Sequence, residues 1–309
     1  MTLAKEHTRH GTIFMRNITT LDCGVFDLSD GIIGQSWIVD LEVSGELDKD
    51  GIVQDFSELK KQVRKSLKES VDHALLIPIK SEFVKFRTTS NGDECWMLTS
   101  VAGRGKKAVD WSYTCPKGAV YPIRSKSLDR ETIALEINKT MGRRLPENIT
   151  SYKISLREED IDPTEAVFRY THGITSHSGM CQRLFHGHRS CIEVHIGEVR
   201  RPDLEQYLVW EVLGKNIHIA SESQVQTTGL EVGARSQSTE PVTIGYTSKS
   251  GLYEGILPAN RVFVVPQETS IEIIAHTLAE VVRAKVGDTE DRIKVACYEG
   301  IEKGAVALS

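Results

Sequence analysis

The sequence lacks the features that mark secreted, membrane-embedded and nucleic-acid-binding proteins. No apolar stretch approaches the roughly 20 residues that cross a membrane, and residues 1–10 have no apolar signal-peptide core. The six cysteines are scattered and never form Cys-x-x-Cys, which favours a reducing compartment over a disulfide framework. There is no long basic run, and the net charge is −5, which argues against a partner held by its phosphates. We therefore expect a cytoplasmic protein with no membrane or nucleic-acid partner.

What is present is the composition of a globular protein, with 39% hydrophobic and 26% charged residues over 309 positions. Residues 32–43 read as a strand, and residues 58–69 read as a helix that Asp55 or Ser57 could cap. The apolar stripe expected to be buried on this helix consists of Phe56, Leu59, Val63 and Leu67.

The remainder of the first half continues in the same mixed pattern. Residues 83–122 alternate between turn signals and predict an added hairpin or small sheet. A second amphipathic helix is expected over residues 129–141, followed by a strand over residues 152–156. The expected order is strand, strand, helix, hairpin, helix, strand.

The second half of the chain repeats this order. Residues 38–43 correspond to 191–196, and the strand at 152–158 corresponds to 292–299. We place the boundary near Asp162-Pro163, where charge and a proline interrupt the pattern. The sequence therefore predicts two units, residues 1–162 and residues 163–309.

A short histidine motif is the most informative stretch. Cys181 precedes His186-Gly187-His188, which opens a predicted strand. Residues two apart on a strand share a face, so His186 and His188 project side by side. With a further histidine upstream they would form a three-histidine site with an open fourth position, as in catalytic zinc centres. The alternative is a pair of hydrogen-bonded surface histidines.

The two halves have lost different parts of this motif. The first half has about Ile18, Ile33 and Gln35 in place of the second half's His172, His186 and His188. Conversely, the first half has Asp72-His73 where the second half has Ile217-His218. Two half-sites that each keep what the other lacks suggest one composite site.

These residues together resemble the 6-pyruvoyl-tetrahydropterin synthase and 6-carboxytetrahydropterin synthase family. The resemblance rests on the following stretches: residues 51–60, Asp72-His73, residues 168–172, Cys181, His186-Gly187-His188, Tyr298-Glu299-Gly300 and Gly304-Ala305. An ordinary member is about half as long, so the chain resembles two fused copies. Residues 83–122 and 222–262 stand outside the resemblance as insertions.

The resemblance implies an α+β tandem T-fold, each unit an antiparallel four-stranded sheet with two helices on one face. It implies zinc bound by His172, His186 and His188, with His177 as the alternative to His172. Only the second unit would then hold the metal.

The resemblance also implies roles for residues around the metal. Cys181 would abstract a proton, paired with Asp72 and His73, which the first unit supplies. Glu299 would anchor the pterin ring, with Glu158 as a second candidate. Thr269 and Ser270 would line the pocket.

The implied activity is that of a zinc-dependent lyase on 7,8-dihydroneopterin triphosphate. The expected product is 6-carboxy-5,6,7,8-tetrahydropterin, as in queuosine biosynthesis, and the alternative is 6-pyruvoyl-tetrahydropterin. A homo-oligomer is expected, with three fused chains replacing six single units. Two rival hypotheses remain: a non-catalytic pterin-binding protein, and a zinc hydrolase that would not need Cys181.

Overall fold

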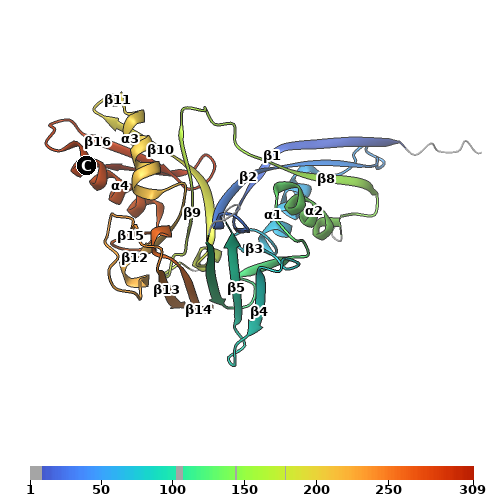
Figure 1. Cartoon of the computed structure of the whole chain (residues 1–309). Helices are drawn as coiled ribbons and strands as arrows, with labels where there is room; N and C mark the ends of the chain where they lie inside the picture. The colour runs from blue at the N-terminus through green and yellow to red at the C-terminus, as the bar shows by residue number, and fades with distance from the viewer. Residues whose placement is uncertain (1–8, 102–106, 143–144, 178) are drawn as a thin grey trace, which may run out of the picture. The chain divides into compact units, whose positions relative to one another are not determined.

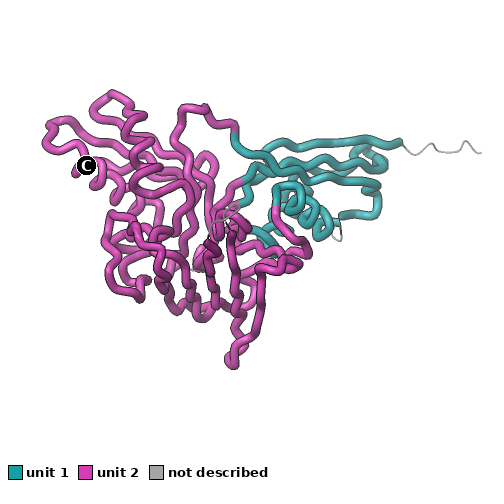
Figure 2. Tube along the Cα trace, viewed as in Figure 1, with its two compact units in different colours: residues 1–21, 37–72, 129–159 teal, residues 22–36, 73–128, 160–309 magenta. Residues whose placement is uncertain are grey.

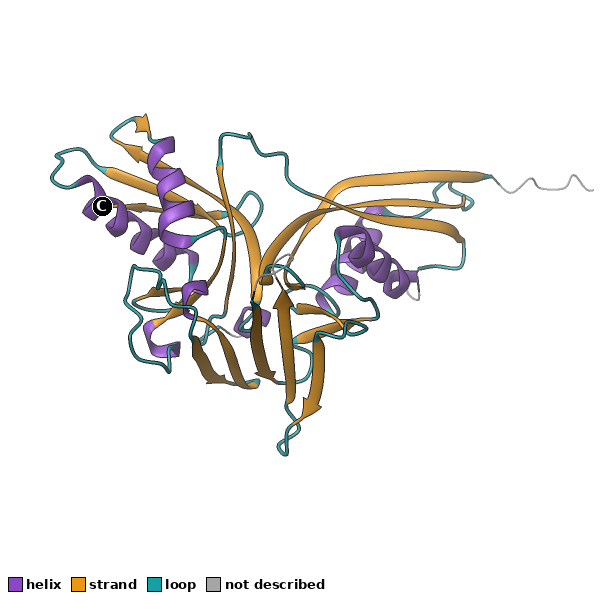
Figure 3. Cartoon of the chain, viewed as in Figure 1, coloured by secondary structure: helices purple, strands orange, loops and turns teal. Residues whose placement is uncertain are grey.

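The computed structural model describes residues 9–101, 107–142, 145–177 and 179–309. Strands dominate and helices are few (Figure 3), which confirms the α+β class. The first half contains, in order, β1 (His10–Asp27), β2 (Gly31–Glu46), α1 (Phe56–Lys68), β3 (Leu75–Pro78), β4 (Val84–Thr88), β5 (Glu94–Val101), β6 (Ala108–Cys115), β7 (Val120–Ile123), α2 (Arg130–Met141) and β8 (Ile149–Arg157).

The second half follows in Figure 1 from yellow-green to red. Its strands are β9 (Ala166–His172), β10 (His186–Ile196), β11 (Val199–Arg200), β12 (Asn216–Ser221), β13 (Pro241–Ser248), β14 (Gly251–Pro258), β15 (Val262–Val265), β16 (Ile293–Tyr298) and β17 (Gly304–Leu308). Its helical segments are η2 (Met180–Gln182), α3 (Pro202–Tyr207), η3 (Leu208–Leu213), η4 (Glu222–Gln224), η5 (Ala259–Arg261) and α4 (Ile271–Val286).

The helix predicted near residue 58 begins earlier than expected. The Asp55 carboxylate accepts hydrogen bonds from the backbone N–H groups of Ser57 and Glu58, at 2.8 and 3.0 Å, so the first turn starts at Phe56. Leu59, Val63 and Leu67 are buried as predicted. The prediction was wrong for Phe56, which is 53% exposed, because the first helical turn precedes the packed part of that face.

The chain comprises two compact units (Figure 2). Unit 1 comprises residues 1–21, 37–72 and 129–159, and unit 2 comprises residues 22–36, 73–128 and 160–309. These units interleave along the sequence and group residues by packing. The predicted repeat, with its boundary at residue 162, describes similarity between two stretches of sequence and not packing, and it stays a prediction.

Unit 1 holds α1, α2 and the long ladder between β2 and β8. These strands pair antiparallel from Ile38 opposite Arg157 to Gly45 opposite Ile149. The Asn138 side chain of α2 docks the helix on β8, because its amide donates to the Ile154 carbonyl at 2.9 Å and accepts from the Ile154 N–H at 2.8 Å. Ile133, Ile137 and Met141 of α2 are buried, as expected for the amphipathic helix predicted over residues 129–141.

Two of the sheets share one strand order. The first runs β7-β3-β1-β2-β8, and the second runs β15-β12-β9-β10-β16 with β17 at its end. The directions of the strands also correspond. In the first sheet β3 is parallel to both β1 and β7, and β8 is antiparallel to β2. In the second sheet β12 is parallel to both β9 and β15, and β16 is antiparallel to β10. The first sheet has five strands and the second has seven, so both are larger than the expected four antiparallel strands, and both contain parallel pairings that the expected sheet lacks.

The two predicted insertions build one further sheet in unit 2. Its order is β13-β14-β6-β5-β4, and all its pairings are antiparallel. The join lies between β14 and β6, where Gly255 pairs with Tyr113. The small sheet predicted over residues 83–122 is therefore confirmed, but residues of the second half complete it.

Candidate metal centre and active site

Three buried histidines lie side by side where β9 ends and β10 begins. His172 and His186 are directly opposite each other in the antiparallel ladder, and His188 follows two residues along β10. Each side chain is at most 1% exposed. One ring nitrogen from each histidine lies within 4.8 Å of the other two. Strand register and the two-residue period therefore bring the three predicted ligands together.

Each ring is held through its Nδ1 atom. Nδ1 of His172 lies 2.7 Å from the Thr269 carbonyl oxygen. Nδ1 of His186 lies 2.8 Å from the Arg183 carbonyl oxygen. A carbonyl only accepts, so in both rings Nδ1 carries the proton and Nε2 keeps its lone pair. This is the arrangement by which outer partners orient metal-binding imidazoles.

The free ring nitrogens then face one another. Nε2 of His172 and Nε2 of His188 are 3.3 Å apart. Nε2 of His186 is buried and has no hydrogen-bond partner within the described residues. A buried lone pair without a partner, as on His186, is costly unless something binds it. The donor set fits a divalent ion that accepts three imidazoles and leaves one position open.

The electrostatics favour the metal-binding form of the imidazoles. Burial, followed by the neighbouring histidines, lowers the pKa of His172 and of His186 well below the ordinary value. Both rings are therefore neutral near pH 7. Neutral imidazole is the form that ligates metal, so no proton must be displaced for binding.

A buried carboxylate that the sequence did not point to holds the third ring. Asp22 Oδ1 lies 3.3 Å from His188 Nδ1, and the Ser36 hydroxyl donates to the same oxygen at 2.5 Å. Lys303 Nζ lies 3.1 Å from Asp22 Oδ2. Burial would raise the pKa of Asp22, but His188, Lys303 and Ser36 together lower it well below the ordinary value. Asp22 is therefore a carboxylate near pH 7.

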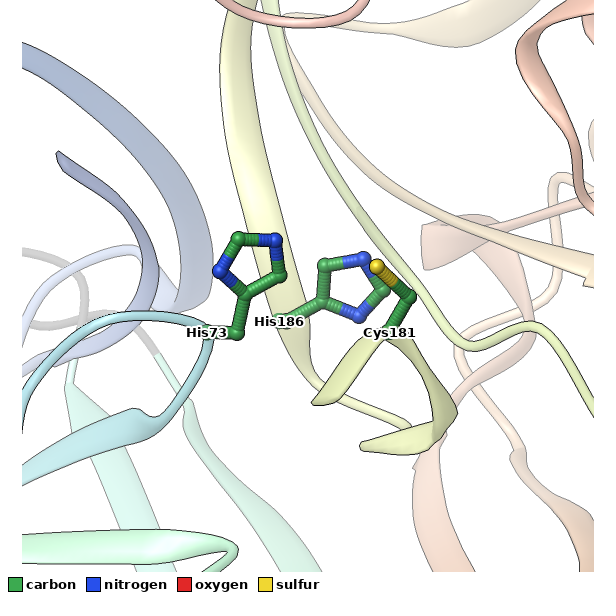
Figure 4. A group of neighbouring side chains, drawn as sticks. All are labelled: His73, Cys181 and His186. Carbon is green, nitrogen blue, oxygen red and sulfur yellow. The ribbon is translucent and has the colours of Figure 1, made fainter. Parts of the chain in front are cut away.

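Two further predicted residues lie close to His186. His73, Cys181 and His186 each offer one ligand atom, and these atoms all lie within 4.8 Å of one another (Figure 4). The His73 ring stacks on His186 with centroids 5.3 Å apart. Cys181 sits in the short η2 turn and is half-buried. Asp72 precedes His73 in the chain and is grouped with unit 1.

His73 is placed by its backbone. It adopts a left-handed conformation, with φ of 56°, which is uncommon for a residue other than glycine. Its backbone N–H donates to the Asp22 carbonyl oxygen at 2.7 Å. Asp22 thus positions His73 through its main chain and His188 through its side chain.

Glu299 lies at the edge of the same group. Its Oε1 is 3.9 Å from His172 Nε2, and its Oε2 is 4.0 Å from Lys303 Nζ. The carboxylate remains 25% exposed. Glu158, the second candidate, is an exposed residue after β8 that belongs to unit 1. Within unit 2, Glu299 is the predicted anchor that lies near the histidines.

Thr269 is buried and makes two hydrogen bonds, one through its carbonyl group and one through its hydroxyl group. Its carbonyl holds His172, and its hydroxyl donates to the Gly173 carbonyl at 3.0 Å. Ser270 is the half-buried residue that precedes α4. His177, the alternative ligand, is exposed, and its Nδ1 accepts from the Gly179 N–H at 2.9 Å.

Sequence reasoning missed Asp22, Ser36 and Lys303. Asp22 and Ser36 lie on β1 and β2, within strands that the first half contributes, and no local motif distinguishes them. The signal that could have found Lys303 is its position four residues after Glu299 and just before β17. Glu268 was also missed. Its carboxylate accepts from the N–H groups of Thr175 and Ser176, at 3.0 and 3.2 Å, and so holds the loop after His172.

Fold and site together define an α+β protein with a candidate three-histidine metal centre beside a cysteine. Residues 32–166 match the family model described as 6-pyruvoyl tetrahydropterin synthase. This match covers 135 of the chain's 309 residues, so the similarity to the family is shown for this segment of the chain. The matched segment includes Asp72 and His73 and ends before His172.

Solved structures similar to this chain include two malaria-parasite proteins. The 6-pyruvoyl tetrahydropterin synthase of Plasmodium vivax is 19% identical, with 50% of this chain and 94% of that chain covered and a TM-score of 0.40. The Plasmodium falciparum protein is 20% identical, with 49% and 99% covered and a TM-score of 0.36. No curated protein matches the chain by sequence. Among the described residues, no helix is long and apolar enough to cross a membrane.

Proposed function

We propose that this chain is a zinc-dependent lyase acting on 7,8-dihydroneopterin triphosphate and forming 6-carboxy-5,6,7,8-tetrahydropterin. The observation that carries the proposal is the meeting of three oriented imidazoles with Cys181 and His73 around the single residue His186. The second candidate product is 6-pyruvoyl-tetrahydropterin, which the description of the matching family model favours. Both reactions begin by removing a proton from the pterin side chain.

Each residue has a role that its chemistry supports. His172, His186 and His188 would hold a zinc ion, which would supply Lewis-acid stabilisation to oxygens of the pterin side chain. Cys181, half-buried and near these imidazoles, accepts the proton from the side-chain carbon as its thiolate. His73, stacked on His186, is placed to move the second proton. Asp72 is its proposed partner, as the resemblance implies.

Pterin recognition is assigned to Glu299. A carboxylate accepts two parallel hydrogen bonds from adjacent N–H groups of a pterin edge. Lys303 lies near both Glu299 and Asp22, and their negative charges raise its pKa against the opposing effect of burial. Lys303 thus stays charged near pH 7 and lies beside the Glu299 carboxylate. Glu158 and the side chains of Thr269 and Ser270 are secondary candidates for the pocket.

The direct test is incubation of zinc-loaded protein with 7,8-dihydroneopterin triphosphate, followed by mass spectrometry of the pterin and assay of released triphosphate. A carboxy-pterin product supports the first proposal, and a pyruvoyl product supports the second. Zinc bound at one equivalent with neither product would contradict both and favour a non-catalytic pterin-binding protein.

Cys181→Ala separates the lyase from a zinc hydrolase. The lyase needs a proton acceptor at this position, so turnover should fall at least about 100-fold, the range in which general-base groups contribute. Zinc content and fold should be unchanged, since the three histidines are intact. A hydrolase that uses metal-bound water would keep its activity in this variant.

We further propose that the chain is a tandem fusion of two T-fold units, residues 1–162 and 163–309, that assembles as a trimer in the cytoplasm. The shared strand order of the two sheets supports the fusion. The six free cysteines fit a reducing compartment. Light scattering tests the assembly, and a monomer would contradict it.

A further inference from the structure

His186 is shared by two different sets of metal-ligand atoms. One set is completed by His172 and His188, and the other by His73 and Cys181. In each set the ligand atoms lie within 4.8 Å of one another. Figure 4 shows His73 and Cys181 on separate segments, both directed toward the His186 ring. The second set is a complete group of three ligands in its own right.

The two sets cannot be filled at the same time. His186 donates its Nδ1 proton to the Arg183 carbonyl at 2.8 Å, so its single lone pair is on Nε2. One lone pair makes one bond to one ion. An ion that takes His186 with His73 and Cys181 therefore leaves the pair formed by His172 and His188.

The chemistry of the second set suits a soft or borderline ion. A thiolate with two imidazoles selects zinc and related transition metals over magnesium or calcium. On binding, the Cys181 thiol gives its proton to solvent and its sulfur forms the bond to the ion. The ion's bonds to His172 and His188 break in the same exchange, and no oxidant or reductant is needed.

We propose that His73, Cys181 and His186 form a second, competing metal position that withdraws Cys181 and His73 from chemistry. The ion exchanges between this position and the three-histidine position. The inference goes beyond the proposed lyase function, because it concerns metal binding by the substrate-free chain. It would hold for this chain whichever pterin product is formed.

Cobalt(II) tests the proposal, since a thiolate bound to cobalt gives a charge-transfer band that imidazole ligands do not give. Metal-free full-length protein is titrated with Co²⁺ and followed by absorption. We expect saturation at one ion per chain, with a thiolate band whose intensity reflects the fraction in the second position. In His188→Gln the band should grow, because the competing position is weakened.

Two variants and one control assign the band. Cys181→Ser should abolish it, and His73→Asn should weaken it; asparagine tolerates the left-handed backbone at this position. Cys191→Ser changes another half-buried thiol and should leave the band unaltered. Absence of a thiolate band in both wild type and His188→Gln would overturn the proposal. Binding of two ions per chain would also overturn it.

Thiol alkylation gives a second readout that does not depend on the fold of a variant. In wild-type protein, iodoacetamide should label Cys181 about tenfold more slowly with Zn²⁺ than without, because a metal-bound thiolate is a poor nucleophile. Mass spectrometry identifies the labelled peptide. An unchanged labelling rate at one bound equivalent of Zn²⁺ contradicts the proposal. Neither measurement uses a pterin, so failure of the lyase proposal is detected separately.

Discussion

Asp22 Oδ1 lies 3.3 Å from Nδ1 of His188, although 166 positions separate the two residues in the sequence. Asp22 belongs to β1, from the first half of the chain, and His188 belongs to β10, from the second. The Asp22 backbone carbonyl also accepts the His73 N–H. One residue without a recognisable motif therefore orients a candidate metal ligand and a candidate proton carrier.

Asp22→Asn should weaken metal binding by about 10–100-fold, the usual effect of losing the outer partner of a metal-bound histidine. The amide is nearly the same size but carries no charge to support the His188 ring. Competition with a coloured zinc chelator measures the affinity directly.

Asp40→Asn provides the matched control. Asp40 is also buried, and its carboxylate is held by Arg157 at 3.0 Å and Arg16 at 3.8 Å in unit 1. Its loss should leave zinc affinity unchanged. Equal affinity of Asp22→Asn and wild type would contradict the role assigned to Asp22.

The stability of the metal-free protein should fall as the pH decreases below about 6.5, the ordinary pKa of histidine. Burial lowers the pKa of His172 and His186 well below that value, and it lowers the pKa of His218 to about 3. As the pH falls, these histidines therefore become protonated at a higher pH in the unfolded chain than in the folded chain. Their stabilising contribution is therefore complete above about pH 6.5 and is lost progressively below it.

Urea unfolding of metal-free protein between pH 7 and pH 5 checks this expectation. Each buried neutral histidine contributes a slope approaching about 1.4 kcal/mol per pH unit below the unfolded pKa. His218→Gln removes one such group and should lower the slope by about that amount. A slope that is the same in the variant and in wild type would show that His218 does not stay neutral in the folded state.

Gly187→Ala should destabilise the protein by about 1–3 kcal/mol, as expected for overpacking. A Cβ at this position would lie 2.5 Å from the Tyr170 carbonyl oxygen and 2.7 Å from the Gly34 Cα. These are backbone atoms, which cannot rotate away. Thermal unfolding of the metal-free protein measures the loss.

Gly11→Ala is the control for this glycine. Its Cβ would meet only the side-chain ends of Leu47 and Val53, each at 3.1 Å, which can adjust. We expect a change within about 0.5 kcal/mol. A similar effect of both substitutions would argue against a close backbone contact at Gly187.

The two sequence halves should not fold independently. The core beneath the insertion sheet combines residues of both, including Trp96 and Tyr113 from the first half and Phe185 and Ile244 from the second. Residues 163–309 expressed alone would expose this surface and the open edge of β14. We expect this fragment to be insoluble alone and to be recovered with residues 1–162 on co-expression. A soluble, monomeric fragment with a cooperative unfolding transition would refute this expectation.

Local patterns correctly predicted the elements that depend on local chemistry. The helix ending at Met141 and the strand that opens with His186 were expected from periodicity, and both are present. The predicted burial of Phe56 was wrong because periodicity shows which face of a helix is apolar but not at which residue that face begins to pack against the protein. The small sheet was predicted only in part, because β14, which pairs with β6, lies 142 positions further on at the Gly255–Tyr113 pair, a separation that no local pattern encodes.

For the site, the sequence alone determined which residue types could act: three histidines, a cysteine and an acid-histidine pair in recognisable order. Their grouping around His186 was decided by strand register, by the η2 turn and by the left-handed backbone at His73. Asp22 and Lys303 entered only through the tertiary structure. A carboxylate or an ammonium group becomes a partner of a metal ligand when folding brings it within a few ångströms in a buried setting. One segment of sequence shows which residues share a face of a strand, but it does not show which residues from distant segments lie close together in the folded protein.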